Sequence, residues 1–407
     1  MLTSHVPLAG IRVVEVATHV FAPMAGAILA EWGADVLKVE PPGTGDPYRG
    51  LVTTGLHPLQ AGVDPYVQSA NRGKRSLGID LGHPEGRDLL GRLVRTADVF
   101  VTSLRPGGRA RLRIDVEDVR ADNPAVVYVR ASAFGPRGPE AARGGYDAGA
   151  YWARSGMQHV LTPAGAAWPR PAPPAFGDLA GALALAGAVC AALVHRAAGG
   201  EPPVIDGSLL AAGLWQIQPD IVSAAPGGAS PQAPAGRYEA SNPLMLTYRT
   251  ADGRFVALTM LASDRHWAAF CRAIGEPERA DDPRFADAAA RRRHARACVE
   301  WLDAVFAARD LDHWREALAG FPGEWAPVQV PRELHDDPQV RANGYIAEVD
   351  VGGDEPLPMV TVPVQFDEQP SRPARAPEHG EHTESVLEEL GLSWDEIGAL
   401  KDRGAIL

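Results

Sequence analysis

The sequence of 407 residues has few cysteines, and their spacing excludes a disulfide framework. The three cysteines, Cys190, Cys271 and Cys298, are odd in number and far apart, and no Cys-x-x-Cys pair occurs. Such sparse cysteines are typical of a reducing compartment. The first residues also lack the basic segment and apolar run of a secretory signal. We therefore expect a cytoplasmic protein.

The chain also lacks a long hydrophobic run and an excess of positive charge. Its longest stretch without a charged residue is Leu179–Val194, which is shorter than the ~20 residues that a membrane span needs. We interpret this stretch as a buried helix and expect no membrane partner. The net charge is −12, whereas sequence-independent binding to nucleic acid depends on clustered Lys and Arg. We therefore expect no nucleic-acid partner.

Several motifs of known chemistry are absent. There is no G-x-S-x-G elbow and no phosphate-binding G-x-x-x-x-G-K-[ST] loop, and the third glycine of a dinucleotide-binding motif is replaced by Tyr48. The segment 378–382 contains two His and two Glu, but it is not H-E-x-x-H, so we predict no metal site. The basic run 291–296 is interpreted as a solvated helix face.

What the first third contains is an alternation of short β-rich runs and helical segments. The predicted strands are 11–17, 34–40, 75–81, 98–102 and 125–130, and the predicted helices include 22–32 and 84–96. This order implies βαβ units and an α/β fold with a mainly parallel sheet. Ligands of such sheets bind beyond the carboxyl ends of the strands. We therefore expect the functional residues in the loops that follow the strands.

The composition changes near residue 225. Residues 224–236 form a Pro/Gly/Ala-rich linker candidate, because neither helix nor strand tolerates so many breakers. The segment that follows predicts a hairpin turning at Asp252-Gly253 and a set of helices at 264–274, 287–308 and 311–319. The predicted organisation is a large domain beginning with 1–224, a smaller α+β domain at 225–330, and a return to the large domain with C-terminal helices at 331–407.

Asp178 precedes the longest apolar helix and admits two interpretations. In the first, its carboxylate is an N-cap that accepts backbone N–H bonds. In the second, the same position favours the ionised form of the carboxylate, and Gly177 allows close approach of a substrate. Such a carboxylate can attack an activated carbonyl group. The residues alone leave both interpretations open.

A basic loop, 71–75, carries three cations in the N-terminal half. Arg72, Lys74 and Arg75 are interpreted either as surface charges or as ligands of a polyanion such as a nucleotide phosphate, to which Arg105 and Arg111 would also contribute.

The sequence resembles the family III CoA-transferases, a family that includes α-methylacyl-CoA racemase. The resemblance is carried by ordered matches along nearly the whole chain, namely Leu8–Glu15, Gly33–Gly43, Gly45-Asp46, Asn71–Ser76, Pro84–Arg87, Ala97–Val101, Arg105–Gly107, Gly145–Asp147, Gly177-Asp178 and Gly380–Thr383. It implies a Rossmann-like large domain with a smaller domain inserted and two chains interlocked as a homodimer.

The resemblance also implies a reaction. Asp178 would be the nucleophile that transfers CoA from an acyl-CoA to a carboxylic acid, through an aspartyl anhydride and an aspartyl-CoA thioester. Coenzyme A would be a substrate, and no cofactor would be permanently bound. The implied CoA contacts, beside the basic loop, are His19, Val20, Ala22, Ile79, Ser103, Leu104, Arg105, Arg111, Gly144, Gly145 and Tyr146.

Two alternatives to the transferase remain. Racemases of this family place a proton-transferring His where this chain has Tyr146. A tyrosine with a pKa near 10 is a poor general base at neutral pH, which favours the transferase over a 2-methylacyl-CoA racemase, although His19 or His159 could substitute. A non-catalytic acyl-CoA-binding protein is the third interpretation, and the intact Gly177-Asp178 pair argues against it.

Overall fold

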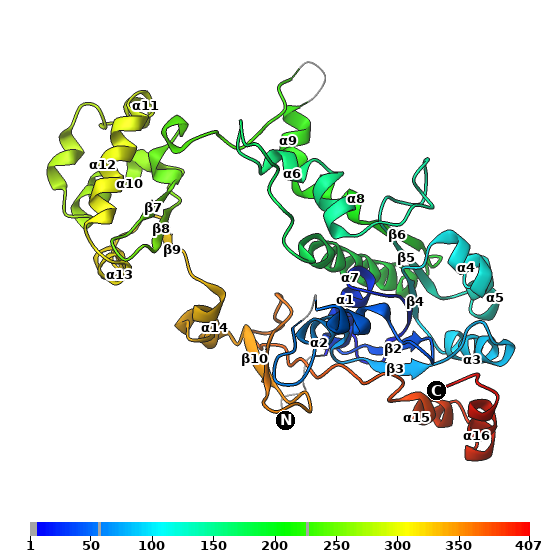
Figure 1. The fold of residues 1–407 in the computed structure, drawn as a ribbon. Helices are drawn as coiled ribbons and strands as arrows, with labels where there is room; N and C mark the ends of the chain where they lie inside the picture. Colours follow the sequence, from blue (N-terminus) through cyan, green and yellow to red (C-terminus); the bar gives the residue numbers. More distant parts are fainter. Residues whose placement is uncertain (1–5, 56–57, 225–227) are drawn as a thin grey trace. The chain divides into compact units, whose positions relative to one another are not determined.

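The computed structural model describes residues 6–55, 58–224 and 228–407. The chain divides into two compact units (Figure 1). The large unit comprises the chain up to His159, Pro171–Ala229 and Pro338–Leu407, and the small unit comprises Val160–Arg170 and Ser230–Asp337. Of the predicted linker 224–236, residues 225–227 lie outside the described residues.

A parallel six-stranded sheet forms the centre of the large unit. Its strands are β1 (Arg12–Val16), β2 (Asp35–Glu40), β3 (Arg75–Gly78), β4 (Val99–Thr102), β5 (Val127–Ser132) and β6 (Val204–Ser208), in the order β3-β2-β1-β4-β5-β6. The first five were predicted, which confirms the α/β class. The sixth was not predicted, because only two apolar residues precede its Asp206-Gly207. Strands covered on both faces are expected to be almost wholly apolar, yet Glu15 and Lys38 lie in β1 and β2 and are fully buried.

Helices connect and cover the strands. They are α1 (Phe21–Glu31), α2 (Pro65–Asn71), α3 (Pro84–Arg95), α4 (Pro106–Leu112), α5 (Val116–Asp122), α6 (Met157–Val160), α7 (Phe176–Ala197), α8 (Leu209–Gln216) and α9 (Gln218–Ser223). The start of α3 follows from its sequence, because His83 accepts the Glu85 N–H and Pro84 occupies the first turn. Figure 1 shows α1 and α7 side by side, and the two helices pack against each other.

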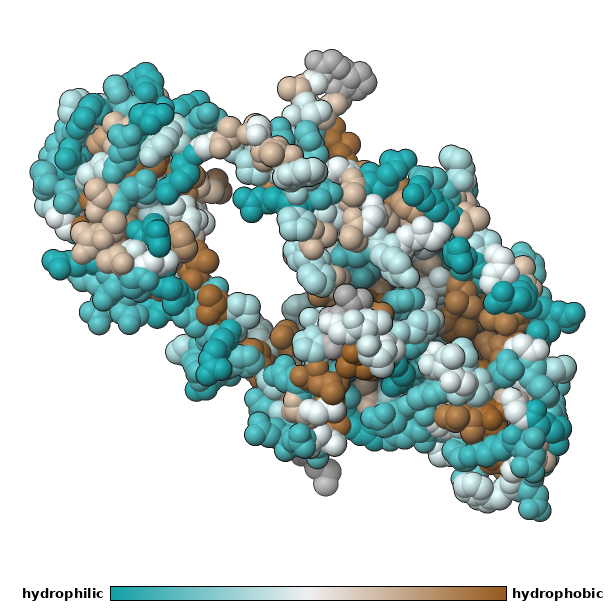
Figure 2. Space-filling view, in the orientation of Figure 1, coloured by the Kyte–Doolittle hydropathy of each residue, from teal (hydrophilic) through white to brown (hydrophobic). Residues whose placement is uncertain are grey.

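Helix α7 corrects one expectation. The charge-free stretch is shorter than a membrane span, but the helix that contains it has 22 residues. Among the described residues it is the one helix long and apolar enough to span a membrane. Less than half of its apolar window is buried in this chain. A core helix of a soluble protein passes the same test of length and composition. The exposed apolar residues on α7 include Leu179, Leu183 and Val194, and Figure 2 shows hydrophobic patches between hydrophilic areas on the visible face of the large unit.

The small unit contains the predicted hairpin. Strands β7 (Thr247–Arg249), β8 (Phe255–Leu258) and β9 (Trp325–Pro327) form an antiparallel sheet. Its helices are α10 (Ser263–Ala273), α11 (Ala288–Arg293), α12 (Ala295–Ala307) and α13 (Leu311–Leu318). The prediction of a single helix at 287–308 is wrong, because the helix is interrupted at His294, which ends α11 and precedes α12. Arg291 is also fully buried, over the Trp267 ring and in an ion pair with Asp264, so its part of the basic run is not a solvated face.

The C-terminal segment returns to the large unit. It contains α14 (Pro338–Asn343), the antiparallel pair β10 (Ile346–Val349) and β11 (Leu357–Val360), α15 (Thr383–Glu389) and α16 (Trp394–Asp402). Ser393 and Glu396 form a capping box at the start of α16. Near β3, the Thr383 hydroxyl accepts the Gly78 N–H, and the Ser76 hydroxyl accepts the Gly380 N–H. These bonds attach the end of the chain to the edge of the sheet.

Candidate active site

The strand order creates a crevice between the loops that follow β1 and β4. Strand β1 pairs with β2 on one side and with β4 on the other. The strands that follow β1 in the sequence therefore extend the sheet first to one side of β1 and then, from β4 on, to the other side. Such a switch point is where open α/β sheets bind ligands. The Thr18 N–H, after β1, donates to the hydroxyl of Ser103, after β4, at 3.0 Å. The structure therefore brings the predicted residues around His19 and Ser103 together.

His19 occupies the loop after β1 in an unusual conformation. Its φ is 66°, a left-handed value that costs a non-glycine residue about 1–2 kcal/mol. The imidazole lies edge-on to the Tyr146 ring, with 5.3 Å between the ring centroids, and its Nδ1 is 3.1 Å from the Thr18 hydroxyl. Burial lowers the pKa of His19, the Lys38 charge adds to this effect, and Asp46 opposes it. The imidazole is therefore mainly neutral at pH 7.

Two cavities flank Leu104. One, of about 200 Å³, is lined by residues of β1 and β2, by Ile79, and by Leu104 and Arg111. The other, of about 120 Å³, is lined by residues that include Ser103, Arg105, Gly144 and Gly145. Arg105 and Arg111 are exposed. Seven of the predicted CoA contacts thus line two neighbouring cavities, which the sheet positions at its carboxyl edge.

The remaining predicted contacts differ in exposure. The Tyr146 side chain is 70% exposed while one edge of the ring meets His19. Val20 and Ala22 are buried, at the start of α1. In this structure neither residue offers substantial surface to a ligand.

The basic loop requires a correction. Lys74 is buried, and its Nζ lies 2.8 Å from Glu15 Oε2 and donates to the Pro23 carbonyl oxygen at 2.7 Å. Arg72 is also buried, with its Nε 2.7 Å from a carboxylate oxygen of Glu31. Their charges are neutralised within the fold and do not face a ligand.

Arg75 belongs to the same correction. Its guanidinium donates to both carboxylate oxygens of Asp35 and to Glu389. Asp35 begins β2, at the end of the sheet opposite the crevice. We therefore remove Arg72, Lys74 and Arg75 from the candidate site.

Asp178 lies in the first turn of α7 and is not its N-cap. The cap position is Ala175, with φ 56° and no side-chain hydrogen bond. Burial raises the pKa of Asp178 to about 7, and the negative charge of Asp147 contributes further. The expectation that the ionised form is favoured is therefore corrected, because burial and the like charge of Asp147 both disfavour ionisation of Asp178.

Asp147 fixes the backbone beside Asp178. Its Oδ1 accepts the Gly177 N–H at 3.0 Å. A Cβ atom at residue 177 would lie 2.1 Å from the Tyr151 ring and 2.4 Å from Asp147 Oδ1. Only glycine fits this position, which explains the Gly-Asp sequence physically.

Sequence reasoning missed Tyr48 as a member of the site. Tyr48 is buried, and its ring centroid lies 6.4 Å from that of His19. Burial is the main cause of its raised pKa, and the charges of Asp64 and Asp178 raise the pKa further. Tyr48 thus lies between the switch-point loop and the start of α7. The sequence contains no motif that marks it, since its contacts come from distant segments.

Among the described residues, no group of three or more His, Cys, Asp or Glu side chains is placed to hold a metal ion. Within the segment 378–382, the His379 Nε2 lies 3.0 Å from the Pro41 carbonyl oxygen.

Comparisons with known proteins agree with this architecture. Residues 8–383 match the family model of CoA-transferase family III. The (R)-2-hydroxy-4-methylpentanoate CoA-transferase of Clostridioides difficile is 28% identical over 396 residues, which cover 97% of this chain and 98% of that protein. The succinate–glutarate CoA-transferase of Agrobacterium fabrum is 33% identical, with 94% of this chain and 96% of that protein covered.

The fold is also similar to solved structures. The crystal structure of a CAIB/BAIF family protein from Brucella suis matches with a TM-score of 0.82 at 28% identity, over 94% of this chain and 99% of that chain. The family match spans most of the sequence and includes both the switch-point loops and the Gly177-Asp178 pair. The chain therefore belongs to CoA-transferase family III, and it is an enzyme of the CoA-transferase class.

Proposed function

We propose that the enzyme transfers CoA from an acyl-CoA to a carboxylic acid with Asp178 as the catalytic nucleophile. The observation that carries this proposal is the state of Asp178, a partly buried carboxyl group beside Asp147 with its pKa raised to about 7. A carboxylate of raised pKa is a stronger nucleophile than an ordinary one, and about half of it is ionised at pH 7.

The reaction needs no metal and no energy source, because each step exchanges one activated acyl bond for another. The Asp178 carboxylate attacks the thioester carbonyl, and CoA thiolate leaves as an aspartyl anhydride forms. The thiolate then attacks the aspartyl carbonyl of this anhydride and releases the first carboxylate product, giving an aspartyl-CoA thioester. The second acid attacks this thioester and displaces CoA thiolate, and the thiolate takes the new acyl group and releases Asp178.

The two cavities on either side of Leu104 support a CoA site at the switch point. Ile79 and Leu104 offer apolar surface, whereas Arg105 and Arg111 offer exposed cations to the phosphates of CoA. Gly144 and Gly145 leave room for a ligand beside Ser103. The net charge of −12 is compatible with this proposal, because the basic residues required are local.

We also propose that two chains form an interlocked homodimer. Several large apolar side chains are exposed in the single chain on the helices that follow Asp147, namely Phe176, Leu179, Leu183, Val194, Leu214, Trp215, Ile221 and Val222. Such a set is suited to a large subunit interface. A cytoplasmic location and the domain limits at 225 and 330 stay predictions.

The proposed reaction is tested with Asp178→Ala. The variant should lose CoA exchange between an acyl-CoA and a labelled acid. It should retain affinity for free CoA, because the Asp178 carboxylate acts in covalent bond formation and not in the binding of CoA. The matched control is Asp122→Asn, which removes a carboxylate at the end of α5 that pairs with Arg95. Near-normal exchange by Asp178→Ala would remove Asp178 from the mechanism.

The acceptor is identified by a screen of carboxylic acids. The two relatives described above are named for different acids, so the screen should pair succinyl-CoA, acetyl-CoA and longer acyl-CoA donors with dicarboxylic and 2-hydroxy acids. New thioesters are detected by mass spectrometry.

Deuterium exchange at the α-carbon of a 2-methylacyl-CoA, with no CoA transfer to any acid, would instead support a racemase that uses His19.

A further inference from the structure

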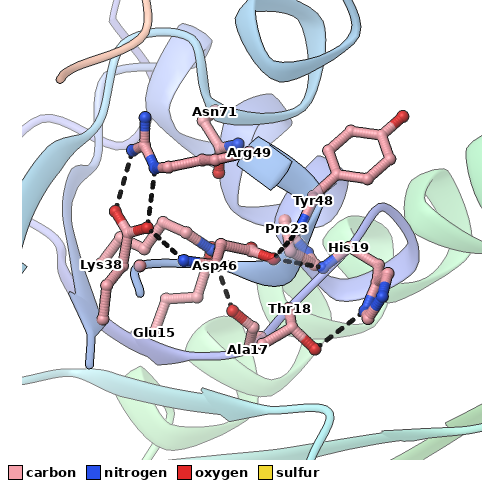
Figure 3. A network of polar contacts seen from close by, with 12 residues as sticks. Glu15, Ala17, Thr18, His19, Pro23, Lys38, Asp46, Tyr48, Arg49 and Asn71 are labelled. Carbon is pink, nitrogen blue, oxygen red and sulfur yellow. Dashed lines mark hydrogen bonds and ion pairs between the residues drawn. The ribbon is translucent and has the colours of Figure 1, made fainter. Parts of the chain in front are cut away.

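A buried ionic network lies directly beneath the loop that carries His19 (Figure 3). Asp46 is buried and is the N-cap of the short helix η1 (Pro47–Thr54). Its Oδ1 accepts the N–H groups of His19 at 3.1 Å and Tyr48 at 2.9 Å. Its Oδ2 lies 2.9 Å from the Nζ of Lys38. One carboxylate therefore joins a buried ion pair to the backbone of two residues of the candidate site.

Lys38 fixes the position of that carboxylate. Its Nζ contacts three acceptors, one for each proton, since it also donates to Glu15 Oε1 at 3.0 Å and to the Ala17 carbonyl oxygen at 2.9 Å. Burial opposes the ionisation of Lys38, but the charges of Glu15 and Asp46 outweigh burial and raise its pKa. Lys74 completes the network at Glu15. Two ammonium groups thus balance two carboxylates, and Lys38 is charged throughout the physiological pH range.

The hydrogen bond from His19 stabilises a strained conformation. Left-handed backbone at a non-glycine residue persists only where the surroundings impose it, and it gathers at functional sites. Here the backbone N–H is held by Asp46, and the imidazole is consequently directed to the ring of Tyr146. The same Asp46 oxygen holds the backbone of Tyr48, whose ring faces His19 from another side.

We propose that Asp46 is a positioning residue of the acyl-CoA site, which holds the His19 loop in its ligand-ready conformation and is itself held by Lys38. This inference rests on the proposed function, because it assigns the loop to the substrate. It differs from a merely structural role in one respect. Loss of the Asp46 charge should lower kcat/KM for acyl-CoA more than loss of the charge of another buried, ion-paired carboxylate.

Asp46→Asn tests this difference, with Glu31→Gln as the matched control. An asparagine offers a single oxygen, so it cannot accept from the His19 and Tyr48 amides and also pair with Lys38. The Glu31 side chain is also buried and ion-paired, with Arg72, but it lies at the opposite end of α1. We expect Asp46→Asn to lower kcat/KM for acyl-CoA by about tenfold or more, and Glu31→Gln to change it less than about threefold after correction for folded fraction.

A second variant removes the strain. In a His19→Gly background the loop adopts a left-handed conformation without cost, so Asp46→Asn should lower CoA affinity less than it does with His19 present. Equal effects in both backgrounds, or equal losses of kcat/KM for Asp46→Asn and Glu31→Gln, would overturn the proposal.

Amide hydrogen exchange separates this inference from the proposed function. Asp46→Asn should speed exchange in the peptide that spans residues 17–20, whereas Glu31→Gln should not. If the wild-type enzyme binds no CoA, the proposed function fails, even when this exchange difference is found. If the wild type binds CoA and the two variants show the same exchange in that peptide, the positioning role fails alone.

Discussion

Asp178 and Asp147 form the pair of side chains on which the proposed chemistry depends. Burial and mutual repulsion act in the same direction on Asp178, so the group is protonated at acidic pH and ionised above about 7. The ionised form is the proposed nucleophile. Activity should therefore rise with pH until Asp178 is fully ionised.

The Asp147→Asn variant tests the contribution of the neighbouring charge. Its amide oxygen can still accept the Gly177 N–H, but the like charge is gone, so the pKa of Asp178 should fall from about 7. We expect the acid limb of the kcat/KM profile to move to lower pH, measured between pH 5 and 9. An unchanged limb would show that Asp147 does not influence the ionisation of Asp178.

Asp178 should also make stability depend on pH. Because its pKa is about 7 in the folded state and near 3.9 when unfolded, its contribution to stability is present at pH 4 and is lost as pH rises through 7. Asp178→Asn removes the cost of the buried charge, so it should raise Tm at pH 8 and have little effect at pH 4. A Tm difference that does not grow with pH would contradict the raised pKa.

At the scale of elements, the sequence predicted the sheet better than the site. Short β-rich runs marked the first five strands, whereas β6 and the helix break at His294 had no such signal. The switch-point loops could be expected from the βαβ pattern, but their residues were named only through the family resemblance. Pairings such as Glu15 with Lys38 and Lys74 join two strands and the loop before β3, and no local pattern predicts them. For the same reason the sequence does not reveal that Lys74 and Arg72 are buried in ion pairs and unavailable as ligand contacts.

The start of α7 yields a prediction of its own. Gly177→Ala should abolish exchange and lower stability, because the added methyl group would overlap Tyr151 and Asp147. Gly398→Ala is the control, since it lies in α16 with no atom within 4 Å of its added Cβ. That change should stabilise the protein by about 0.5–1 kcal/mol, as Ala is the better helix former. Urea unfolding and the exchange assay measure both effects.

At the scale of the molecule, the exposed apolar residues on α7 to α9 predict an obligate dimer. Light scattering coupled to gel filtration should give twice the mass of one chain at all accessible concentrations. Trp215→Glu places a charge among these residues, and Trp215 is 69% exposed in the single chain. The variant should yield monomers or aggregates. A soluble monomer as the wild-type species would contradict the proposed interlocked dimer.

The most direct test of the central claim is the mass of the enzyme after incubation with acyl-CoA alone. We expect a covalent adduct of one CoA less one water on the peptide that contains Asp178. A carboxylic acid acceptor should remove this adduct, and the Asp178→Ala variant should not form it. An enzyme that exchanges CoA between acids with no adduct at Asp178, or with the adduct on another residue, would contradict the central claim.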